Sequence, residues 1–545
     1  MENLALLKPK LEPFVLATLD IHWADKDKPI VAAFTHYLTN LLTAQTFYTK
    51  PIMMMLLRHL QGSNRLSEDD DATRERVFSN VHEVIKAALE VSPLNARSAL
   101  LDYARECMPF MLTMDEASHT AYLKNLMEIS FYVRYDEDRQ RLTTLVVDRL
   151  VQLDAYLPKL EEPEDDDDEE EEGGQFEMDV DSTSKPVRRL DDAAIAQRNL
   201  DEAMAVMFQL LGERFTRDRS CRRTFWNNLL SVFESHILPT HATAHTQFLL
   251  FRFLALDAEE ESEGKGQLST YTSAFLEWLW KKFQDPNTPG IWRQATVCYI
   301  ASLVARGKFV DLWTTKMCLK RLMEWIHKYI AAREERKSSK SGVDPFFCDL
   351  KAHGPFYAAC QAAFYMFAFR HQEFVAGGRK EMEFLSGLGF QQVVTCSLNP
   401  LRVIMPPVVK NFSALVRHLQ LAYCDTVIAR NSRITLPVVG NLSQSGGGKA
   451  LLLDSFFPFD PYLLKKSRNY IDDSFRVYTG ALVGNDDDDE EEESSEEEEN
   501  HDSDMESGTE EEMDADGLRT KRRRHKSGES LIQQFMYGTS PGFKV

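Results

Sequence analysis

Hydrophobic positions recur at helical spacing over most of the chain. Phe34, Leu38, Leu41 and Leu42 follow an i, i+4, i+7, i+8 pattern. Such spacing places apolar side chains on one stripe of a helix with 3.6 residues per turn. Strand-like alternation is nearly absent, so the pattern predicts an all-α protein. The clearest windows are 34–42, 81–89, 204–211, 225–236, 275–283, 356–367 and 412–419.

Short connections that contain proline separate these windows, at Pro93, Pro109, Pro239, Pro286 and Pro400. Proline favours the starts and stops of helices. Amphipathic helices joined by tight turns over hundreds of residues favour stacked antiparallel pairs, because each pair can bury its stripe only against its neighbours. We therefore expect a HEAT-repeat-like α-solenoid; a large globular helical domain is the alternative.

Two acidic segments dominate the formal charge of −22. Residues 161–184 hold 14 acids and residues 486–516 hold 20, and neither stretch contains Lys or Arg. Runs of like charge repel themselves and bury little apolar area. We expect N-terminal helical repeats over 1–160, a disordered acidic loop over 161–185 and C-terminal helical repeats over 186–478. A mostly disordered tail over 479–545 should follow, and one continuous solenoid with an inserted loop is favoured over two separate domains.

Composition argues against several classes of protein. The chain has no run of about 18 apolar residues, so no membrane span is expected. Its start, Met1-Glu2-Asn3-Leu4, lacks the basic and apolar regions of a secretory signal. The eight cysteines are scattered without a CxxC pair, which argues against a zinc ribbon or a disulfide scaffold. A reducing compartment, cytosol or nucleus, is expected.

Candidate catalytic motifs are weak. His241 and His245 have the i, i+4 spacing that lets two imidazoles share a metal ion, but Ala242 stands where a metalloprotease helix carries Glu. The alternative is that these histidines hydrogen-bond to backbone at a helix start. The glycine-rich stretch before Lys449 departs from a phosphate-binding loop, since Ala450 replaces the required Ser or Thr. We expect no catalytic residue, metal or cofactor, and no enzyme; a metal hydrolase at the two histidines is the alternative.

Basic residues lie beside aromatics at Trp280-Lys281-Lys282 and near Arg293, Arg306, Trp292 and Tyr299. Aromatics next to bases can bind nucleic acid. These aromatics, however, fall on helical faces where core packing explains most of them. Direct DNA contact is therefore expected to be weak or absent.

The tail carries a more specific signal, a basic cluster of Lys521, Arg522, Arg523, Arg524, His525 and Lys526. Exposed positive charge in a disordered segment is what a nuclear import receptor binds. We predict a nuclear import segment here; a simple counter-charge to the acidic tail is the alternative.

Several hydroxyl side chains fit minimal kinase motifs. Acids follow three residues after Ser494, Ser495, Ser503, Ser507 and Thr509, as an acidophilic kinase requires. Ser92 and Ser540 precede proline, as proline-directed kinases require. Ser92 is the notable candidate, because a dianion at a helix junction inside the folded body would disturb packing or a partner surface.

Several long segments, taken in their order along the chain, resemble those of a known protein family. LPTHATAHTQFLLF (238–251) is followed by characteristic segments at 274–310, 346–371, 398–412 and 454–472. Together they closely resemble the RNA polymerase I-specific transcription initiation factor family, a growth-regulated factor that bridges the polymerase and the promoter core factor. The similarity is dense over 225–480 and looser over 30–155.

The resemblance implies an all-helical HEAT-repeat protein without enzymatic activity. It implies that the chain binds RNA polymerase I through the stalk and dock region, contacts the promoter-bound core factor, and works in the nucleus and nucleolus. It also implies regulation by phosphorylation and a possible homodimer away from the polymerase. The alternative is a nuclear transport-type helical-repeat receptor or adaptor, which would have no need of its own import signal.

Overall fold

The structure of the protein is a computed structural model that describes residues 11–62, 71–113, 115–157, 185–217, 219–240, 243–261, 269–338, 350–435, 453, 457–459 and 462–478. The first half contains α1 (Glu12–Leu19), α2 (Lys28–Ala44), η3 (Thr46–Tyr48), α3 (Thr49–His59), α4 (Asp71–Val91), α5 (Pro93–Glu106), α6 (Glu116–Tyr132), α7 (Asp136–Tyr156), α8 (Lys185–Arg217), α9 (Arg219–Val232) and η4 (Phe233–Ile237). The second half contains α10 (Phe248–Glu261), α11 (Thr270–Gln284), α12 (Gly290–Arg306), α13 (Leu312–Ser338), α14 (Leu350–Ala376), α15 (Arg379–Gly387), α16 (Phe390–Thr395), η5 (Pro400–Arg402), α17 (Pro406–His418), α18 (Asp425–Thr435) and α19 (Lys465–Arg468).

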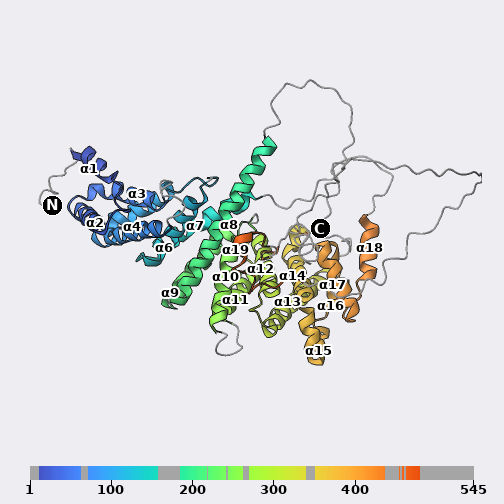
Figure 1. The fold of residues 1–545 in the computed structure, drawn as a ribbon. Helices are drawn as coiled ribbons and strands as arrows, with labels where there is room; N and C mark the ends of the chain where they lie inside the picture. Colours follow the sequence, from blue (N-terminus) through green and yellow to red (C-terminus); the bar gives the residue numbers. More distant parts are fainter. Residues whose placement is uncertain are drawn as a thin grey trace, which may run out of the picture.

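The helices form an elongated two-layer array that runs from α1 at one end to α18 at the other (Figure 1). In the first half, α2, α4, α6 and α8 pack in succession in one layer, and α3, α5, α7 and α9 in the other. The C-terminal ends of α3 and α5 lie together, because the Gln61 side chain donates a hydrogen bond to the Cys107 carbonyl. Stacked helix pairs of this kind are the HEAT-type arrangement, so the predicted all-α repeat fold is confirmed.

Local sequence signals mark the starts of several helices. Pro93 opens α5 and Pro406 opens α17, at positions where a missing N–H costs no helical hydrogen bond. The Asp115 side chain caps α6 by accepting a hydrogen bond from the Ser118 N–H at 3.1 Å, and Ser269 caps α11 in the same way. The seven predicted windows all fall on helices, although Leu419 comes one residue after the end of α17.

The core of the second half is centred on α12 and α14. Both helices are buried around most of their circumference, and α14 packs against α12, α13 and α17. A helix that is apolar on all sides belongs inside a protein rather than on its surface. The Phe364 and Phe412 rings stack with their centroids 3.7 Å apart, which joins α14 to α17.

Within the described ranges there is no β-strand, and extended pairing is limited to an isolated antiparallel bridge between Gly307 and Phe475. No helix in these ranges is both long and apolar enough to cross a bilayer. The cysteines of the described part, such as Cys298 and Cys360, are free and mostly buried. Burial raises the pKa of the Cys298 thiol to about 12. Residues 161–184 lie outside the described residues, so the predicted division of the chain at 160 and 186 stays a prediction.

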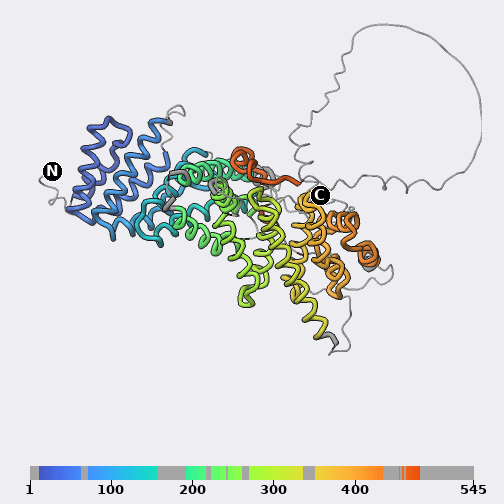
Figure 2. Tube along the Cα trace, turned by 90° about the horizontal axis from the view of Figure 1, so that it is seen from below, coloured from blue at the N-terminus to red at the C-terminus, as the bar shows by residue number. Residues whose placement is uncertain are grey.

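The segment after α18 crosses the helices of the second half. We call its described residues, 453, 457–459 and 462–478, the C-terminal strap. Figure 2 shows the strap lying across the array, with α19 against α8. The strap therefore returns from the far end of the array to the junction between its halves.

Candidate functional site

The junction between the two halves is built on a buried carboxylate, that of Asp154 near the end of α7. Its side chain is completely buried. Oδ2 accepts hydrogen bonds from the backbone N–H of His245 and of Thr246, both at 2.8 Å, and from the Thr246 hydroxyl at 2.9 Å. Oδ1 accepts from the Ala244 N–H at 3.2 Å and from the His245 ring at 2.9 Å. One carboxylate thus accepts hydrogen bonds from three consecutive backbone N–H groups just before α10.

The surroundings of Asp154 keep it ionised. Burial alone would raise the pKa of its carboxyl group, but the hydrogen bond from the His245 ring and those from the backbone N–H groups hold that pKa below its usual value. His245 Nε2 accepts a hydrogen bond from the Leu463 N–H at 3.2 Å, so the ring proton sits on Nδ1, facing Asp154. The imidazole therefore connects α7 to the strap.

This geometry explains His245 without a metal ion. Both of its ring nitrogens have protein partners, the Asp154 carboxylate for Nδ1 and the Leu463 backbone N–H for Nε2, so the backbone-bonding alternative fits Nε2 alone. His241 lies outside the described residues, and the described part of the chain contains no group of three metal-ligating side chains.

The strap makes polar contacts with helices that are distant in sequence. The Ser467 hydroxyl donates to Asp201 of α8 at 2.6 Å, and the Lys466 ammonium donates to Glu202 at 2.7 Å. Further along, the Arg476 N–H donates to the Arg306 carbonyl at 2.6 Å. The strap therefore reaches α8 and then returns over the end of α12.

Aromatic side chains seat the strap in the core. Phe457 stacks on Tyr365 of α14 with centroids 3.7 Å apart, and Tyr462 packs on Phe248 of α10 at 4.5 Å. Phe459 contacts Phe248 at 5.3 Å and is fully buried. Large buried aromatics dominate packing energies, so the strap is a structural part of the second half and not an appendage.

The basic and aromatic residues that suggested nucleic-acid binding mostly serve packing. Tyr299 and Trp280 are buried, and Arg306 is buried between the rings of Phe369 and Phe475 at 4.4 and 5.1 Å. The Arg293 guanidinium donates to the carbonyl of Phe283 at 2.7 Å. These side chains present no row of open aromatic faces to a nucleic acid.

Several large apolar side chains of the described array are exposed. One set lies on the N-terminal repeats, with Leu94 77% and Phe110 70% exposed. The other lies on the second half, with Trp313 66% and Tyr423 64% exposed. Exposed large apolar side chains on a rigid scaffold are typical of protein-binding surfaces.

Ser92 lies beside the first of these sets, as the N-terminal flanking residue of α5. It is buried, its carbonyl accepts from the Ala96 N–H at 2.8 Å, and its side chain makes no capping hydrogen bond. A phosphate on this side chain would have to displace the first turn of α5. The other candidate sites, Ser494, Ser495, Ser503, Ser507, Thr509 and Ser540, and the basic cluster 521–526 lie outside the described residues.

No sequence pattern indicates Asp154 or the role of the strap. Asp154 occupies an ordinary polar position in a helical pattern, and its partners are about 90 residues away in sequence, as in the pair with His245. The stretch 454–472 belongs to the segments that carry the family resemblance, and its density of Phe and Tyr is the available sign of burial.

Comparisons with known proteins agree with this architecture. The sequence profile of the family described as "RNA polymerase I specific transcription initiation factor RRN3" matches residues 1–483. The RNA polymerase I-specific transcription initiation factor RRN3 of Mus musculus is 32% identical over 505 residues, covering 87% of this chain and 73% of the relative. Its counterpart from Schizosaccharomyces pombe is 26% identical, with 85% and 76% covered. A crystal structure of RNA Polymerase I Transcription Initiation Factor Rrn3 shares the fold, with a TM-score of 0.65 at 18% identity, covering 87% of this chain and 90% of that one.

Proposed function

The chain belongs to the RNA polymerase I specific transcription initiation factor RRN3 family, and from this premise we propose that it recruits RNA polymerase I to ribosomal DNA promoters. In this proposal it binds the polymerase and the promoter-bound core factor at the same time, and it does so without enzymatic chemistry. The observation that carries the proposal is the family match, which spans every described helix.

The elongated array suits a bridging role. Exposed apolar side chains occur in both halves, at Leu94 and Phe110 in the N-terminal repeats and at Trp313 and Tyr423 in the second half. We assign the polymerase stalk and dock region to the N-terminal set and the core factor to the second set. A rigid body that holds two partners raises their effective concentration at the promoter without any new contact between them.

Regulation by phosphorylation and delivery to the nucleolus are further parts of the proposal. Phosphate at Ser92 would disturb the start of α5, next to the exposed Leu94, and so weaken polymerase binding. Lys521–Lys526 would supply nuclear import. The proposal also includes a homodimer of the factor when it is not bound to polymerase, and weak or absent direct contact with DNA. The N-terminal and C-terminal helical repeats would act together as one scaffold.

Residue-level crosslinking of the purified chain to RNA polymerase I tests the proposal. Crosslinks from the stalk and dock subunits should concentrate on α3–α7, and crosslinks from core factor on α12–α18. Crosslinks spread evenly along the array, or confined to α12–α18, would contradict the assignment. Co-purification from nuclei supplies an independent check, because a transport receptor would bring nuclear-pore components in place of polymerase I subunits.

A further inference from the structure

The described part of the C-terminal strap ends at Tyr478, which is fixed to α14 and α17. Its hydroxyl donates a hydrogen bond to Asn411 Oδ1 of α17 at 3.3 Å, and its ring packs against that of Phe369 of α14 with centroids 4.9 Å apart. Only 6% of its surface is exposed. The chain that follows Tyr478 therefore starts from a fixed point beside α17.

An acidic run begins eight residues later. Residues 486–499 contain twelve acids in fourteen positions and no Lys or Arg. A chain extends by at most about 3.6 Å per residue, so Asp486 lies within about 29 Å of Tyr478. The family match ends at residue 483, so the run is not part of the region that this chain shares with the family profile. A high negative charge is thus tethered close to α17.

The exposed face of α17 carries positive charge. Lys410 stands next to Asn411, and Arg417 follows seven residues later; both cationic side chains are exposed. Seven residues are close to two helical turns, so the two cations lie on the same face, about 10 Å apart along the axis. The opposite face, with Phe412 and Leu415, is buried. The helix contains no Asp or Glu, so nothing within α17 compensates the two cations.

Acids from neighbouring elements compensate this charge only in part. Residues 396–435 contain five Lys or Arg and one acid, Asp425. The Asp425 carboxylate lies 3.8 Å from the Arg417 guanidinium, and the two side chains are 60% and 61% exposed, so this pair is weak. Glu373 of α14, near the end of the strap, is paired with the buried Arg370 at 2.5 Å. The face of α17 therefore keeps an excess of positive charge.

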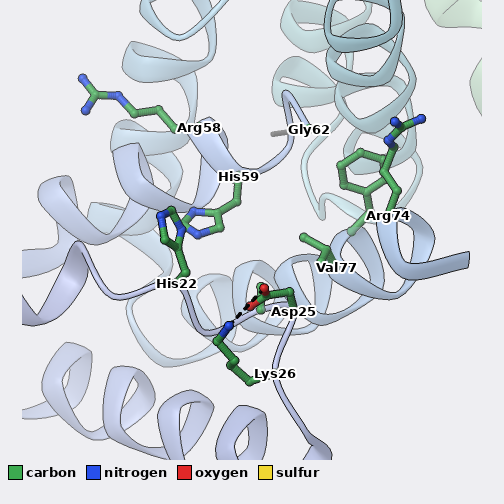
Figure 3. A pocket seen from close by; sticks show the side chains of 10 residues that line it. His22, Asp25, Lys26, Arg58, His59, Gly62, Arg74 and Val77 are labelled. Carbon is green, nitrogen blue, oxygen red and sulfur yellow. Dashed lines mark hydrogen bonds and ion pairs between the residues drawn. The ribbon is translucent and has the colours of Figure 1, made fainter. Parts of the chain in front are cut away.

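A further group of basic residues lines a cavity of about 400 Å³ in the N-terminal repeats. There the Lys26 ammonium pairs with the Asp25 carboxylate at 3.2 Å, as Figure 3 shows. The cavity is lined by residues of α3 and α4, at the opposite end of the elongated array from α17 (Figure 1). A run that is tethered at Tyr478 reaches α17 first, so α17 is the face to which we assign it.

We propose that the acidic run 486–499 docks in cis on the exposed face of α17, where its carboxylates pair with Lys410 and Arg417. Each exposed pair is weak, but a short tether gives a local concentration in the millimolar range, which favours this run over free acidic chains. The docked run covers the face and excludes other polyanions from it. The inference goes beyond the proposed recruitment of polymerase, and its test uses neither polymerase nor core factor.

Carbodiimide coupling of the full chain tests for the contact, because this reagent joins a Lys amine directly to a carboxylate that touches it. At low salt and high dilution, mass spectrometry of the monomer band should find Lys410 joined to an acid of 486–499. At 1 M salt, where the Debye length is about 3 Å, this product should fall by about fivefold or more. Arg417→Glu should lower it by about threefold, whereas Lys28→Glu, at the exposed start of α2, should leave it within about twofold.

A matched pair of full-length variants identifies the occupant. Residues 486–493 and 165–172 have the same sequence, DDDDEEEE, and each octet is changed in turn to NNNNQQQQ. A labelled peptide with the sequence of 486–499 is then titrated by fluorescence anisotropy at low salt. It should bind the 486–493 variant at least about fivefold more tightly than the wild type, because the face is vacated, and the 165–172 variant within about twofold of the wild type. Adding Lys410→Glu and Arg417→Glu to the 486–493 variant should abolish that gain.

Three results would overturn the proposal. The first is that Lys410 does not couple to the run in the monomer; coupling confined to covalent dimers would make the occupant a second copy of the chain. The second is an equal gain in peptide affinity for the two octet variants, which would show a general effect of net charge. The third is a 486–493 variant whose affinity does not respond to Lys410→Glu and Arg417→Glu, which would place the peptide elsewhere. Circular dichroism of each variant confirms that it folds.

Discussion

Replacing Asp154 by Asn is a sharp test of the junction between the two halves. The new side chain keeps the shape of the carboxylate but loses its charge and turns one acceptor oxygen into an NH₂ group. The amide oxygen of Asn can take the place of Oδ2 and still accept hydrogen bonds from the His245 N–H, the Thr246 N–H and the Thr246 hydroxyl. The NH₂ group then faces the Ala244 N–H and the protonated Nδ1 of His245, which are both donors. His245 cannot escape by moving its proton to Nε2, because Nε2 accepts from the Leu463 N–H.

The expected cost follows from the burial of this pair. The substitution leaves two buried donors, the Ala244 N–H and the His245 Nδ1–H, without an acceptor, and each unsatisfied donor costs about 1–3 kcal/mol. Folded domains are stable by roughly 5–15 kcal/mol, so Asp154→Asn should remove a large part of the stability of this region. The surface pair of Asp148 and His236, at 3.6 Å, supplies the matched control. Asp148→Asn should cost less than about 1 kcal/mol.

Urea unfolding followed by far-ultraviolet circular dichroism measures both variants. The midpoint for Asp154→Asn should fall well below those of the wild type and of Asp148→Asn. A midpoint equal to that of the control would refute the view that this carboxylate organises the junction. A double-mutant cycle with His245→Leu should show strong coupling between the two side chains, as expected for direct partners.

We also expect the effect of Asp154→Asn on the free energy of unfolding to depend on pH. The folded-state pKa of Asp154 lies below the usual value, so its contribution to the free energy of unfolding is complete above pH about 4 and is lost as the pH falls through the folded-state pKa. The stability difference between the wild type and Asp154→Asn should therefore shrink in acid. A difference that stays constant down to pH about 2 would show that the charge of Asp154 is not the source of the effect.

Three further predictions concern the strap, the α4–α5 junction and the tail. Tyr462→Ala should lower the free energy of unfolding by about 3–5 kcal/mol and speed amide hydrogen exchange in α8 and α10. Tyr423→Ala, at an exposed position, should change it by less than about 0.5 kcal/mol. Equal effects of the two substitutions would mean that the strap is not part of the core. Ser92→Asp should weaken the pull-down of RNA polymerase I more than Ser98→Asp at an exposed position of α5, and unchanged binding would remove Ser92 from the regulatory account. Changing Lys521–Arg524 to alanine should leave a fluorescent fusion in the cytoplasm, and an unchanged nuclear signal would reveal another import route.

The helices could be predicted because each one is encoded locally. The stripe at Phe34, Leu38 and Leu41 is complete within eight residues, and Pro93 marks the start of a helix regardless of what surrounds it. Repeat folds follow from such units, since stacking is the way their stripes become buried. The all-α array was therefore accessible without coordinates.

The junction and the strap could not be predicted, because their partners are far apart in sequence and irregular in backbone. The Leu463 N–H and His245 Nε2 lie 218 positions apart. A backbone partner for His245, one of the two alternatives from the sequence, is found at Nε2 but not at Nδ1, which bonds Asp154, and no rule of periodicity or spacing names either partner. In the same way, nothing near Asp201 announces that it caps a short helix at Lys466 and Ser467.

The strap also has a consequence for co-translational folding. Helix pairs of a solenoid can stack as soon as they emerge, since their contacts are local, and early stacking should be fast. The apolar side chains of α10 and α14 that contact Phe457, Phe459 and Tyr462, however, stay exposed until the strap has been synthesised. Messages truncated between α18 and the strap should therefore yield products that aggregate or require chaperones, while products that end just beyond Tyr478 should remain in solution.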